Sequence, residues 1–423
     1  MFLNGPMPPG FVVRRLQRAK MHGCRKKTRV LCVIMMLNVF VFVFILVGVS
    51  RNLDQDKGDQ RKPRVPSGRF WRKQMTSEIF WNKEQQRLDY IYNPILMSGL
   101  TNDSLLELPD WLNDTKSPDP CQPDYSVTTQ VKDYNSLPPR FQDFLLHMHC
   151  RSYPMIMDQP RVCESKPYLL LAVKSLAPHF DRRQAIRESW GRVGVLANRT
   201  IATVFLLGNA VAVDHFPNLS GMLSHEARLY GDLLQWDYRD SFFNLTLKEV
   251  LFLDWFSQRC PDARFVFKGD DDVFVNTWRI LDFLHNLPEI RARDLFIGDV
   301  ITNASPHRDR KLKYFIPESV FVGPYPPYAG GGGFLYSGEL ALQLHNISQQ
   351  VALYPIDDVY TGMCLQKLGL VPEKHKGFRT FDIHEKYRGN PCAYKSLMLV
   401  HSRTPQEMIK IWAWLSDPEL DCQ

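Results

Sequence analysis

Residues 265–276 read FVFKGDDDVFVN, a run in which three adjacent aspartates separate two apolar segments. The first apolar segment, 265–267, has the composition of a buried strand, so the aspartates are expected where that strand ends. Ligands of open α/β sheets bind at the carboxyl ends of the strands. Because neighbouring carboxylates repel one another and resist desolvation, a cation must compensate them if they line a pocket. This stretch therefore predicts an α/β fold and the sheet edge at which the function lies.

The rest of the C-terminal half alternates between strand-like and helix-like patterns. Four further apolar runs have the length of buried strands: 168–173, 203–207, 233–238 and 397–400. Three segments begin like helices, with a capping residue followed three positions later by Gln or Glu: Asp181, Thr246 and Thr404. This alternation predicts an α/β domain with a largely parallel sheet over residues 167–423.

The N-terminal part of the chain has the pattern of a membrane anchor. Residues 1–29 hold eight basic side chains and no acidic one, and residues 30–49 follow without any charge. About 20 apolar residues span a bilayer as a helix, and this run is longer than the apolar core of a cleaved signal peptide. Since the positive-inside rule leaves the basic tail in the cytosol, we expect a single-pass type II protein with a luminal body.

The net charge of +7 comes from that basic tail. The chain has 52 basic and 45 acidic residues, so without the eight basic residues of the tail 44 remain against 45. A nearly neutral body offers no extended basic surface to a polyanion, and nucleic acid is therefore excluded as a partner.

Between the anchor and the α/β domain, the composition predicts two segments. Residues 50–68 are polar and lack periodicity, as is typical of a flexible stem. Residues 69–166 contain aromatic clusters, prolines and three cysteines, which indicates an ordered accessory region in the lumen. The predicted order is thus a cytosolic tail (1–29), a transmembrane anchor (30–49), a stem, an accessory region and the α/β domain.

Cysteines and glycosylation sequons agree with a luminal body. Seven of the nine cysteines follow the anchor, where an oxidising lumen favours disulfides, and this odd number leaves at least one without a partner in the chain. No CxxC pair is present, so a zinc site is not expected. The sequon at Asn303 is weakened by Pro306. The sequons predicted to carry glycans are Asn102, Asn113, Asn198, Asn218, Asn244 and Asn346.

The aspartate run can hold a divalent cation. Side chains alternate along extended backbone, so Asp270 and Asp272 are predicted to point the same way. Their oxygens suit Mg²⁺ or Mn²⁺, and the cation can in turn hold a diphosphate. Phe274 stands where an EF-hand requires another oxygen ligand, which excludes that motif. The alternative is a solvated acidic turn, which the apolar flanks disfavour.

Two other stretches have more than one interpretation. Arg183, Arg187 and Trp190 share one face of the first helix, and they either shape a pocket or form an arginine-rich surface. The four glycines at 330–333 are not followed by the Lys-Ser/Thr of a phosphate-binding loop. They are expected either to let a sugar ring approach the backbone or to form a flexible loop.

A second acidic pair, Asp357 and Asp358, stands at the predicted start of a helix. Acidic residues stabilise a helix N-terminus, but a carboxylate at a pocket edge also serves as a general base for a hydroxyl group. About 85 residues separate this pair from the aspartate run, which is consistent with opposite walls of one cleft.

Taken together, these segments resemble the β-1,3-glycosyltransferase family, which includes the β-1,3-galactosyltransferases and the β-1,3-N-acetylglucosaminyltransferases. The resemblance rests on RRQAIRESW, FVFKGDDDVFVN, YAGGGGFLYSG and IDDVYTG, which occur in family order between residue 167 and the C-terminus. The stretches KSLAPHFDRRQAIRESWG and LGLVPEKHKGFRTFDI are most similar to the branch that extends poly-N-acetyllactosamine. The resemblance implies a GT-A (Rossmann-like) nucleotide-sugar-binding domain at the Golgi membrane, UDP-GlcNAc as the donor and Mn²⁺, with Mg²⁺ as an alternative.

The reaction that the resemblance implies is an inverting transfer of GlcNAc to the 3-hydroxyl of a terminal β-galactose on a glycoprotein or glycolipid. The alternatives are a UDP-galactose β-1,3-galactosyltransferase, a non-catalytic luminal lectin and a two-metal phosphohydrolase. Both homo- and hetero-oligomers are compatible with the sequence.

The resemblance also assigns roles to individual residues. Asp272 and His401 are expected to hold the metal, and Asp358 is expected to take the proton from the acceptor hydroxyl. The residues expected to hold the UDP-sugar are Lys174, Arg187, Asp270, Asp271, Gly331 and Gly332. Asp357 is expected to orient the acceptor, and Tyr314 is expected beside the sugar pocket on the acceptor side.

Overall fold

The computed structural model describes residues 78–92, 121–210 and 217–422. The predicted tail, anchor and stem, and the sequons Asn102 and Asn113, lie outside these residues. Within the described ranges, no helix combines the length and the apolar character needed to cross a bilayer.

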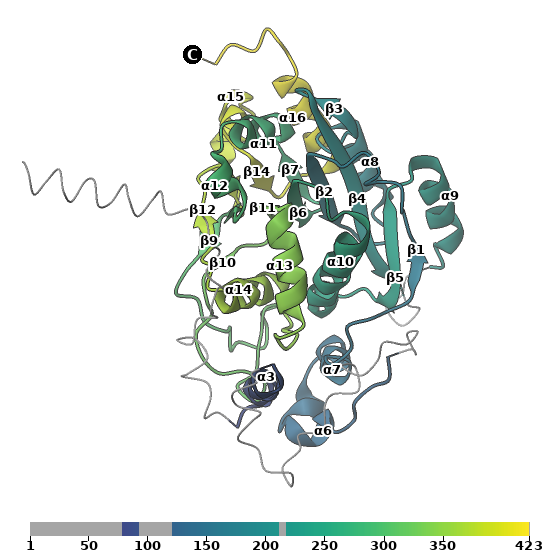
Figure 1. Cartoon of the computed structure of the whole chain (residues 1–423), viewed down its shortest axis with the longest axis vertical. Helices are drawn as coiled ribbons and strands as arrows, with labels where there is room; N and C mark the ends of the chain where they lie inside the picture. The colour runs from purple at the N-terminus through teal and green to yellow at the C-terminus, as the bar shows by residue number, and fades with distance from the viewer. Residues whose placement is uncertain (1–77, 93–120, 211–216, 423) are drawn as a thin grey trace, which may run out of the picture. The chain divides into compact units, whose positions relative to one another are not determined.

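A large mixed sheet forms the centre of the fold, with the strand order β1-β5-β4-β2-β6-β11-β8-β12 (Figure 1). Its strands are β1 (Met155–Met157), β2 (Leu169–Lys174), β4 (Arg199–Asn209), β5 (Leu233–Arg239), β6 (Phe265–Asp270), β8 (Phe296–Gly298), β11 (Gly333–Ser337) and β12 (Glu373–Lys374), with β3 (Gly194–Leu196) paired to the start of β4. Strands β5, β4, β2 and β6 are mutually parallel, as predicted. The strand that follows the glycine run, β11, is antiparallel to both of its neighbours.

Two smaller sheets and a set of helices complete the fold. One small sheet has the order β13 (Phe378–Arg379), β14 (Leu399–His401), β7 (Val273–Val275), and the other pairs β9 (Val300–Ile301) with β10 (Tyr328–Ala329). The helices are α3 (Phe80–Ile91), α6 (Val127–Gln130), α7 (Pro139–Leu146), α8 (Phe180–Glu188), α9 (Ser220–Tyr230), α10 (Leu245–Arg259), α11 (Thr277–His285), α12 (Glu289–Ala292), α13 (Gly338–Ser348), α14 (Asp357–Lys367), α15 (Cys392–Lys395) and α16 (Pro405–Leu415), with 3-10 turns η2 (Tyr134–Ser136), η4 (Phe242–Asn244) and η5 (Glu385–Tyr387).

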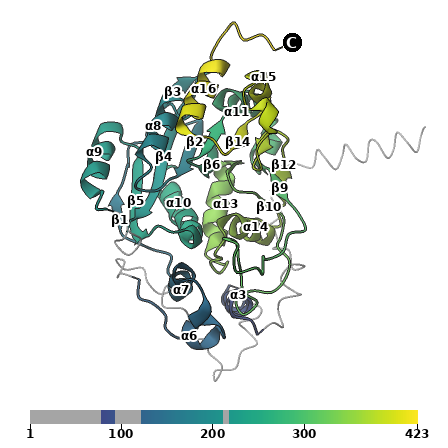
Figure 2. The same cartoon turned by 180° about the vertical axis from the view of Figure 1, so that it is seen from behind.

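Both faces of the sheet are buried, which explains why its central strands are continuous apolar runs. Along β2, Leu170 and Ala172 belong to the core that also contains residues of α10, α13 and α14. Leu169, Leu171 and Val173 point to the other face and join the core that contains residues of α8, α11 and α16. The sheet is therefore the middle layer between two sets of helices, which can be followed in Figures 1 and 2.

The accessory region packs directly on the α/β domain. Trp81 of α3 is fully buried, and its indole N–H donates a hydrogen bond to the carbonyl oxygen of Leu353 at 3.0 Å. Its ring meets Phe321 and Tyr354 edge to face. The aromatic residues of this segment therefore anchor the accessory region to the domain.

Only one of the three predicted capping boxes forms. Thr404 and Glu407 exchange the two expected side-chain-to-backbone hydrogen bonds at the start of α16. The predictions at Asp181 and Thr246 are wrong, because α8 and α10 both begin before these residues. The hydroxyl of Thr246 instead donates to the carbonyl oxygen of Tyr354, which ties α10 to the segment before α14.

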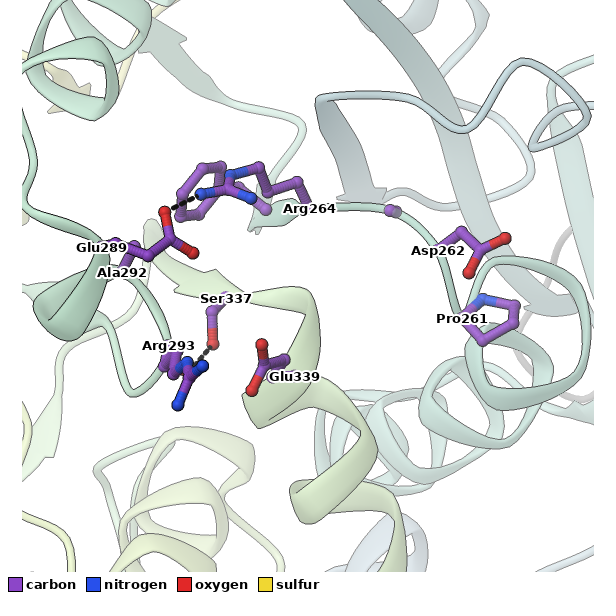
Figure 3. Close-up of a pocket in the computed structure, with 10 residues that line it drawn as sticks. Pro261, Asp262, Arg264, Glu289, Ala292, Arg293, Ser337 and Glu339 are labelled. Atoms are coloured by element: carbon purple, nitrogen blue, oxygen red, sulfur yellow. Dashed lines mark hydrogen bonds and ion pairs between the residues drawn. The ribbon is translucent and has the colours of Figure 1, made fainter. Parts of the chain in front are cut away.

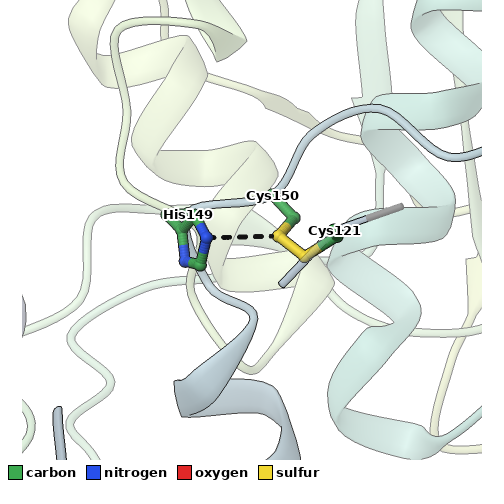
Figure 4. A group of neighbouring side chains, drawn as sticks. All are labelled: Cys121, His149 and Cys150. Atoms are coloured by element: carbon green, nitrogen blue, oxygen red, sulfur yellow. Dashed lines mark hydrogen bonds between the residues drawn. A yellow bond between two sulfur atoms is a disulfide. The ribbon is translucent and has the colours of Figure 1, made fainter. Parts of the chain in front are cut away.

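Three disulfides are present, and the odd cysteine count is explained by one buried free thiol. The bonds join Cys121–Cys150, Cys163–Cys260 and Cys392–Cys422, while Cys364 is free. His149 lies beside the first bond, with its Nε2 3.4 Å from the sulfur of Cys150 (Figure 4). Because the two sulfurs are bonded to each other, these three side chains do not form a metal site.

Gly338→Ala is expected to destabilise the fold strongly. A Cβ atom at this position, where β11 turns into α13, would lie 1.8 Å from the carbonyl oxygen of Ala263, and backbone cannot move aside easily. Overpacking of this kind costs about 1–3 kcal/mol or more. Gly221→Ala in α9 is the matched control, because a Cβ there meets nothing within 4 Å. Thermal unfolding checks both variants, and equal melting temperatures would contradict the prediction.

Candidate functional site

The acidic turn lies where two sheets meet. β2 ends at Lys174 and β6 ends at Asp270, and these two residues are paired in the sheet register. The chain then turns through Asp271 and Asp272 into β7, where Val273 is paired with His401 of β14. The aspartates therefore stand at the carboxyl edge of the parallel strands, as the sequence predicted.

The three aspartates have three different environments. Asp271 is buried, whereas the side chains of Asp270 and Asp272 are 33% and 28% exposed. Only Asp270 belongs to a strand, because Asp271 and Asp272 form the turn between β6 and β7, so the extended backbone on which the predicted D-x-D arrangement depends is absent here. Within this turn the middle side chain is directed into the fold and its two neighbours stay partly exposed.

The middle carboxylate is bound entirely by protein groups. Asp271 accepts hydrogen bonds from Ser175 at 2.6 Å and from Arg182 at 2.8 Å, and its Oδ2 lies 2.7 Å from Nδ1 of His179. Burial alone would raise the pKa of Asp271, but the bonds to His179, Ser175 and Arg182 outweigh it and lower the pKa. We had expected Asp271 to contact the nucleotide sugar, and the structure instead gives it the role of holding the turn.

Asp272 and His401 face each other across the junction of the two sheets. Nε2 of His401 lies 3.6 Å from Oδ1 of Asp272. The other ring nitrogen, Nδ1, lies 3.1 Å from the carbonyl oxygen of Thr380 and is therefore the protonated one in the neutral tautomer. This leaves Nε2 free to coordinate, and a backbone carbonyl that orients a histidine in this way is a regular feature of metal sites.

Lys174 connects the two acidic clusters. Its ammonium group lies 2.9 Å from Oδ1 of Asp270 and donates to Oδ2 of Asp357 at 2.7 Å. Burial alone would lower the pKa of this lysine, but Asp270, Asp357 and Asp358 outweigh it and hold the pKa well above its ordinary value. The aspartate run and the pair at Asp357 are thus joined through a shared buried ammonium group, and their placement on opposite walls of one cleft stays a prediction.

Asp358 has a free acceptor atom in the site. It begins α14 together with Asp357, and among the described residues its Oδ1 has no hydrogen-bond partner. Burial raises the pKa of Asp358 well above the ordinary value, and the charges of Asp357 and Asp270 add to this effect. A partly exposed carboxylate with raised proton affinity is suited to accept a proton from a bound hydroxyl.

Internal packing explains much of the glycine run. A Cβ atom at Gly331 would lie 3.0 Å from Oδ2 of Asp358, so only glycine leaves that carboxylate unobstructed. Gly333 has φ +150°, and a Cβ there would lie 2.8 Å from the carbonyl oxygen of Lys268. Gly332 contributes its carbonyl oxygen to the backbone N–H of Asp270. The run therefore fits the backbone against β6 and leaves space beside the second acidic pair.

Arg187 is not brought to the acidic turn. Its guanidinium group donates to both oxygens of Asp232 and also pairs with Glu226, while it stacks 3.9 Å from the ring centroid of Tyr230. We had placed Arg187 at the donor, but its bonds are directed to α9 and the start of β5. Arg183 on the same face is fully buried, so the alternative of an arginine-rich surface is also wrong.

Tyr314 packs edge to face on Phe242 with ring centroids 5.3 Å apart, while Tyr328 lies beside α14. Tyr328 packs on α14, where a Cβ at Gly362 would lie 2.7 Å from the Cβ of Tyr328. Gly362 is one helical turn after Asp358 and so shares its face. Burial raises the pKa of Tyr328 to about 12, and Asp358 and Tyr314 both contribute to the shift.

The residues that hold the acidic turn carry no motif of their own in the sequence. Ser175 and His179 lie in the connection that follows β2, and Arg182 lies in the first turn of α8. Since β2 is the neighbour of β6, this connection must reach the same sheet edge. That topological relationship was the available signal, and the arginine face chosen from helical spacing reaches the turn only through Arg183, which donates to the hydroxyl of Ser175 at 3.2 Å.

The predicted glycan sites differ in accessibility. Asn198, Asn218 and Asn346 are exposed. Asn244 is buried, and its amide nitrogen, the atom to which a glycan is attached, donates to the carbonyl oxygen of Arg239 at 2.8 Å. The fold therefore does not present Asn244 for modification.

One pocket lies away from this site. It is lined by residues such as Asp262 and Arg264 just before β6, Glu289 at the start of α12, Ser337 at the end of β11 and Glu339 in α13 (Figure 3). Since β6 begins there and reaches the acidic turn at its other end, this pocket is on the opposite edge of the sheet and is not part of the site.

Known proteins similar to this chain are glycosyltransferases. A family model described as galactosyltransferase matches residues 181–376. The N-acetyllactosaminide beta-1,3-N-acetylglucosaminyltransferase 2 of Mus musculus is 57% identical over 400 residues, which cover 94% of this chain and 99% of the mouse protein. The Homo sapiens protein of the same name is 56% identical over 398 residues, with the same shares.

More distant matches point in the same direction. A UDP-GlcNAc:betaGal beta-1,3-N-acetylglucosaminyltransferase 7 from Rattus norvegicus is 46% identical over 288 residues, covering 66% of this chain and 72% of the rat protein. Among solved structures, the WbbM bifunctional glycosyltransferase has a TM-score of 0.32 and 10% identity, covering 60% of this chain and 50% of that one, a likeness too slight to bear on the fold.

Proposed function

The chain belongs to the galactosyltransferase family, and we propose that it transfers GlcNAc from UDP-GlcNAc to the 3-hydroxyl of a terminal β-galactose, extending poly-N-acetyllactosamine. The relatives that are 56–57% identical over nearly their whole length are named for this activity. The observation that carries the proposal is the arrangement of Asp270, Lys174 and Asp357 in one connected cluster, with Asp358 beside it. We further propose that the mixed α/β domain is of the GT-A type.

The general base of the proposed reaction is Asp358. The 3-hydroxyl of galactose gives its proton to the partly exposed carboxylate of Asp358 while the hydroxyl oxygen attacks the anomeric carbon of GlcNAc, and the bond from this carbon to UDP breaks. A single displacement inverts the anomeric configuration. Asp357 is held by Lys174 and orients the galactose, and Gly331 leaves room for the sugar beside the base.

Asp272 and His401 fit a divalent cation. A carboxylate oxygen and an imidazole nitrogen 3.6 Å apart, both accessible, with the second ring nitrogen held by a carbonyl, suit Mn²⁺ and, less closely, Mg²⁺. When bound, the cation would stabilise the negative charge of the departing diphosphate. Asp270 and Lys174 would border the same diphosphate from β6 and β2.

Incubation of the purified full-length chain in detergent with UDP-GlcNAc, Mn²⁺ and lactose tests the proposal. Formation of a trisaccharide with GlcNAc β-linked to O3 of galactose is expected. Binding without turnover would support a lectin, and phosphate release without an acceptor would support a phosphohydrolase. Preference for UDP-galactose in a donor panel would favour a β-1,3-galactosyltransferase.

Asp272→Ala is expected to abolish the Mn²⁺-dependent part of UDP binding. Loss of even a hydrogen-bond partner of a metal ligand lowers metal affinity roughly 10–100-fold, so loss of the ligand itself is expected to exceed that range. Calorimetric titration of UDP with and without Mn²⁺ checks this. Asp282→Ala, at an exposed position in α11, is the control. An unchanged Mn²⁺ effect in Asp272→Ala would remove this residue from the metal site.

We also propose that the protein is a single-pass type II protein of the Golgi membrane with residues 30–49 as its anchor and glycan-bearing proteins or lipids as its acceptors. Three disulfides and exposed sequons at Asn198, Asn218 and Asn346 support a luminal body. Glycosidase treatment of the expressed protein, with each asparagine replaced by glutamine in turn, tests the topology and the use of each sequon.

A further inference from the structure

The connection between α13 and α14 runs through the interior of the protein. Residues 351–356 are all buried, although they belong to neither a helix nor a strand. Connections usually run over the surface, because a buried backbone needs a partner for each of its polar groups. The connector, residues 350–354, comes shortly before Asp357 and Asp358, which begin α14. Its position therefore determines where the proposed base lies.

The side-chain amide of Gln85 in α3 binds the connector at two points. Its nitrogen donates to the carbonyl oxygen of Gln350 at 3.0 Å, and its oxygen accepts the backbone N–H of Ala352 at 2.9 Å. The same nitrogen also donates to Asp89 at 3.0 Å, so both of its N–H groups are used. Gln85 is only 2% exposed. This polar side chain is therefore buried in order to pair with a backbone that has no neighbouring strand.

Two more side chains of the accessory region bind carbonyl oxygens of the connector. The indole N–H of Trp81 donates to the oxygen of Leu353 at 3.0 Å. Arg151 donates to the oxygen of Val351 at 2.6 Å, and also to that of Ser348, the last residue of α13, at 2.9 Å. The accessory region thus binds the connector through three side chains that come from two separate parts of the sequence.

The α/β domain binds the connector from its own side. The hydroxyl of Thr246 in α10 donates to the carbonyl oxygen of Tyr354. Lys367, in the last turn of α14, donates to the oxygen of Gln350 at 2.8 Å and pairs with Asp89 of α3. α3 therefore contacts the connector that precedes α14 and also the far end of that helix, and Figure 1 shows it on the side of the domain where α13 and α14 meet.

We propose that the accessory region positions the general base, because α3 and Arg151 fix the connector and the connector fixes the start of α14. This inference rests on the proposed function, since it takes Asp358 as the base. A general base must lie within hydrogen-bond reach of the hydroxyl that it activates, and a displacement of about 1 Å can lower a rate about a hundredfold. Trp81, Gln85 and Arg151 are thus positioning residues, which act on the reaction through the backbone of the connector.

Gln85→Met tests the proposal on the full-length chain in detergent. The substitution keeps the length of the side chain and removes both hydrogen bonds to the connector. We expect kcat for transfer to fall about tenfold to a hundredfold. Calorimetry is expected to give an unchanged affinity for UDP with Mn²⁺, because Asp272 and His401 belong to the turn after β6 and to β14 rather than to α14.

Asn82→Leu is the matched control on the same helix. Asn82 is 1% exposed, and its amide makes the same kind of paired contact with the backbone of Val322, with one hydrogen bond of 3.1 Å and one of 3.2 Å. The control is expected to lower the melting temperature about as much as Gln85→Met but to keep the wild-type kcat. Equal values of kcat in the two variants would overturn the proposal, since a general loss of stability acts on both.

Trp81→Phe repeats the test with a second side chain, and it decides the question if Gln85→Met does not fold. Phenylalanine keeps a ring beside Phe321 and Tyr354 but lacks the N–H that binds Leu353. The same fall in kcat with an unchanged affinity for UDP is expected. A wild-type kcat in Trp81→Phe would overturn the proposal.

Hydrogen exchange measured by mass spectrometry gives a readout that does not need turnover. Faster exchange in the first two turns of α14 in Gln85→Met, but not in Asn82→Leu, supports the proposal, and equal exchange in the two variants overturns it. A wild-type chain that transfers no GlcNAc would refute the proposed function. The exchange comparison would still decide whether α3 holds the start of α14.

Discussion

Asp358→Asn is expected to lower the rate of transfer by about a thousandfold while the affinity for UDP stays unchanged. Asparagine keeps the shape of the side chain but cannot accept a proton, and a positioned general base contributes about 10²–10⁴-fold. The carboxylate is suited to this role because burial, Asp357 and Asp270 raise its pKa. Initial rates of transfer from UDP-GlcNAc and calorimetric binding of UDP give the two measurements.

The same substitution is expected to leave the fold intact or make it more stable. An acid whose pKa is raised by folding contributes stability while it is protonated, and this contribution is lost as the pH rises through the folded-state pKa. At neutral pH the ionised carboxylate of Asp358 lowers the stability of the fold, and the neutral amide of asparagine avoids this loss. Asp254→Asn, at an exposed aspartate in α10, is the control for rate and stability. A fall in UDP affinity that parallels the fall in rate would contradict the base assignment.

Lys174→Met is expected to destabilise the protein by about 3–5 kcal/mol, which lowers the melting temperature by roughly 10 °C. The substitution keeps the length of the side chain but leaves two carboxylates, Asp270 and Asp357, without the ammonium group that lies within 2.9 Å of both. A buried charge that loses its partner is far more costly than an exposed one. Transfer activity should also be lost, since both acidic clusters depend on this lysine.

A double substitution separates the charge effect from a packing effect. Lys174→Met combined with Asp357→Asn is expected to regain part of the lost stability, because one of the two unpaired charges is removed. Lys166→Met is the matched control, since it breaks an ion pair with Asp262 of the same 2.9 Å length that is largely exposed and contributes little to stability. Equal melting temperatures for the Lys174 and Lys166 variants would show that the buried pairs contribute nothing.

Features that depend on a few consecutive residues were predictable from the sequence. The apolar run before Asp270 was enough to place the aspartates at a strand end, whereas the extended backbone expected across them is replaced by a turn at Asp271 and Asp272. The cap at Thr404 also formed as predicted, because both of its hydrogen bonds lie within four residues. The start of α14 at Asp357 likewise depends on a few consecutive residues and was predicted.

Features that depend on partners distant in the chain were not predictable. Helical spacing correctly predicted that Arg183 and Arg187 share one face of the helix. It could not predict that this face contacts Glu226 and Asp232. Thr246 was expected to cap a helix, yet its hydroxyl bonds to a carbonyl 108 residues away. Helical spacing identifies which side chains share a face, whereas the residues that this face contacts depend on the order of the strands.

The junction of the two sheets has a consequence for biosynthesis. Asp272 is followed by β7, but its counterpart His401 comes from β14, one of the last strands to leave the ribosome. A nascent chain can form the parallel strands and the acidic turn early, yet with the proposed role of His401 it stays inactive until β14 pairs with β7. Loss of the last few dozen residues, as from a premature stop codon, would therefore yield a partly folded and catalytically silent protein.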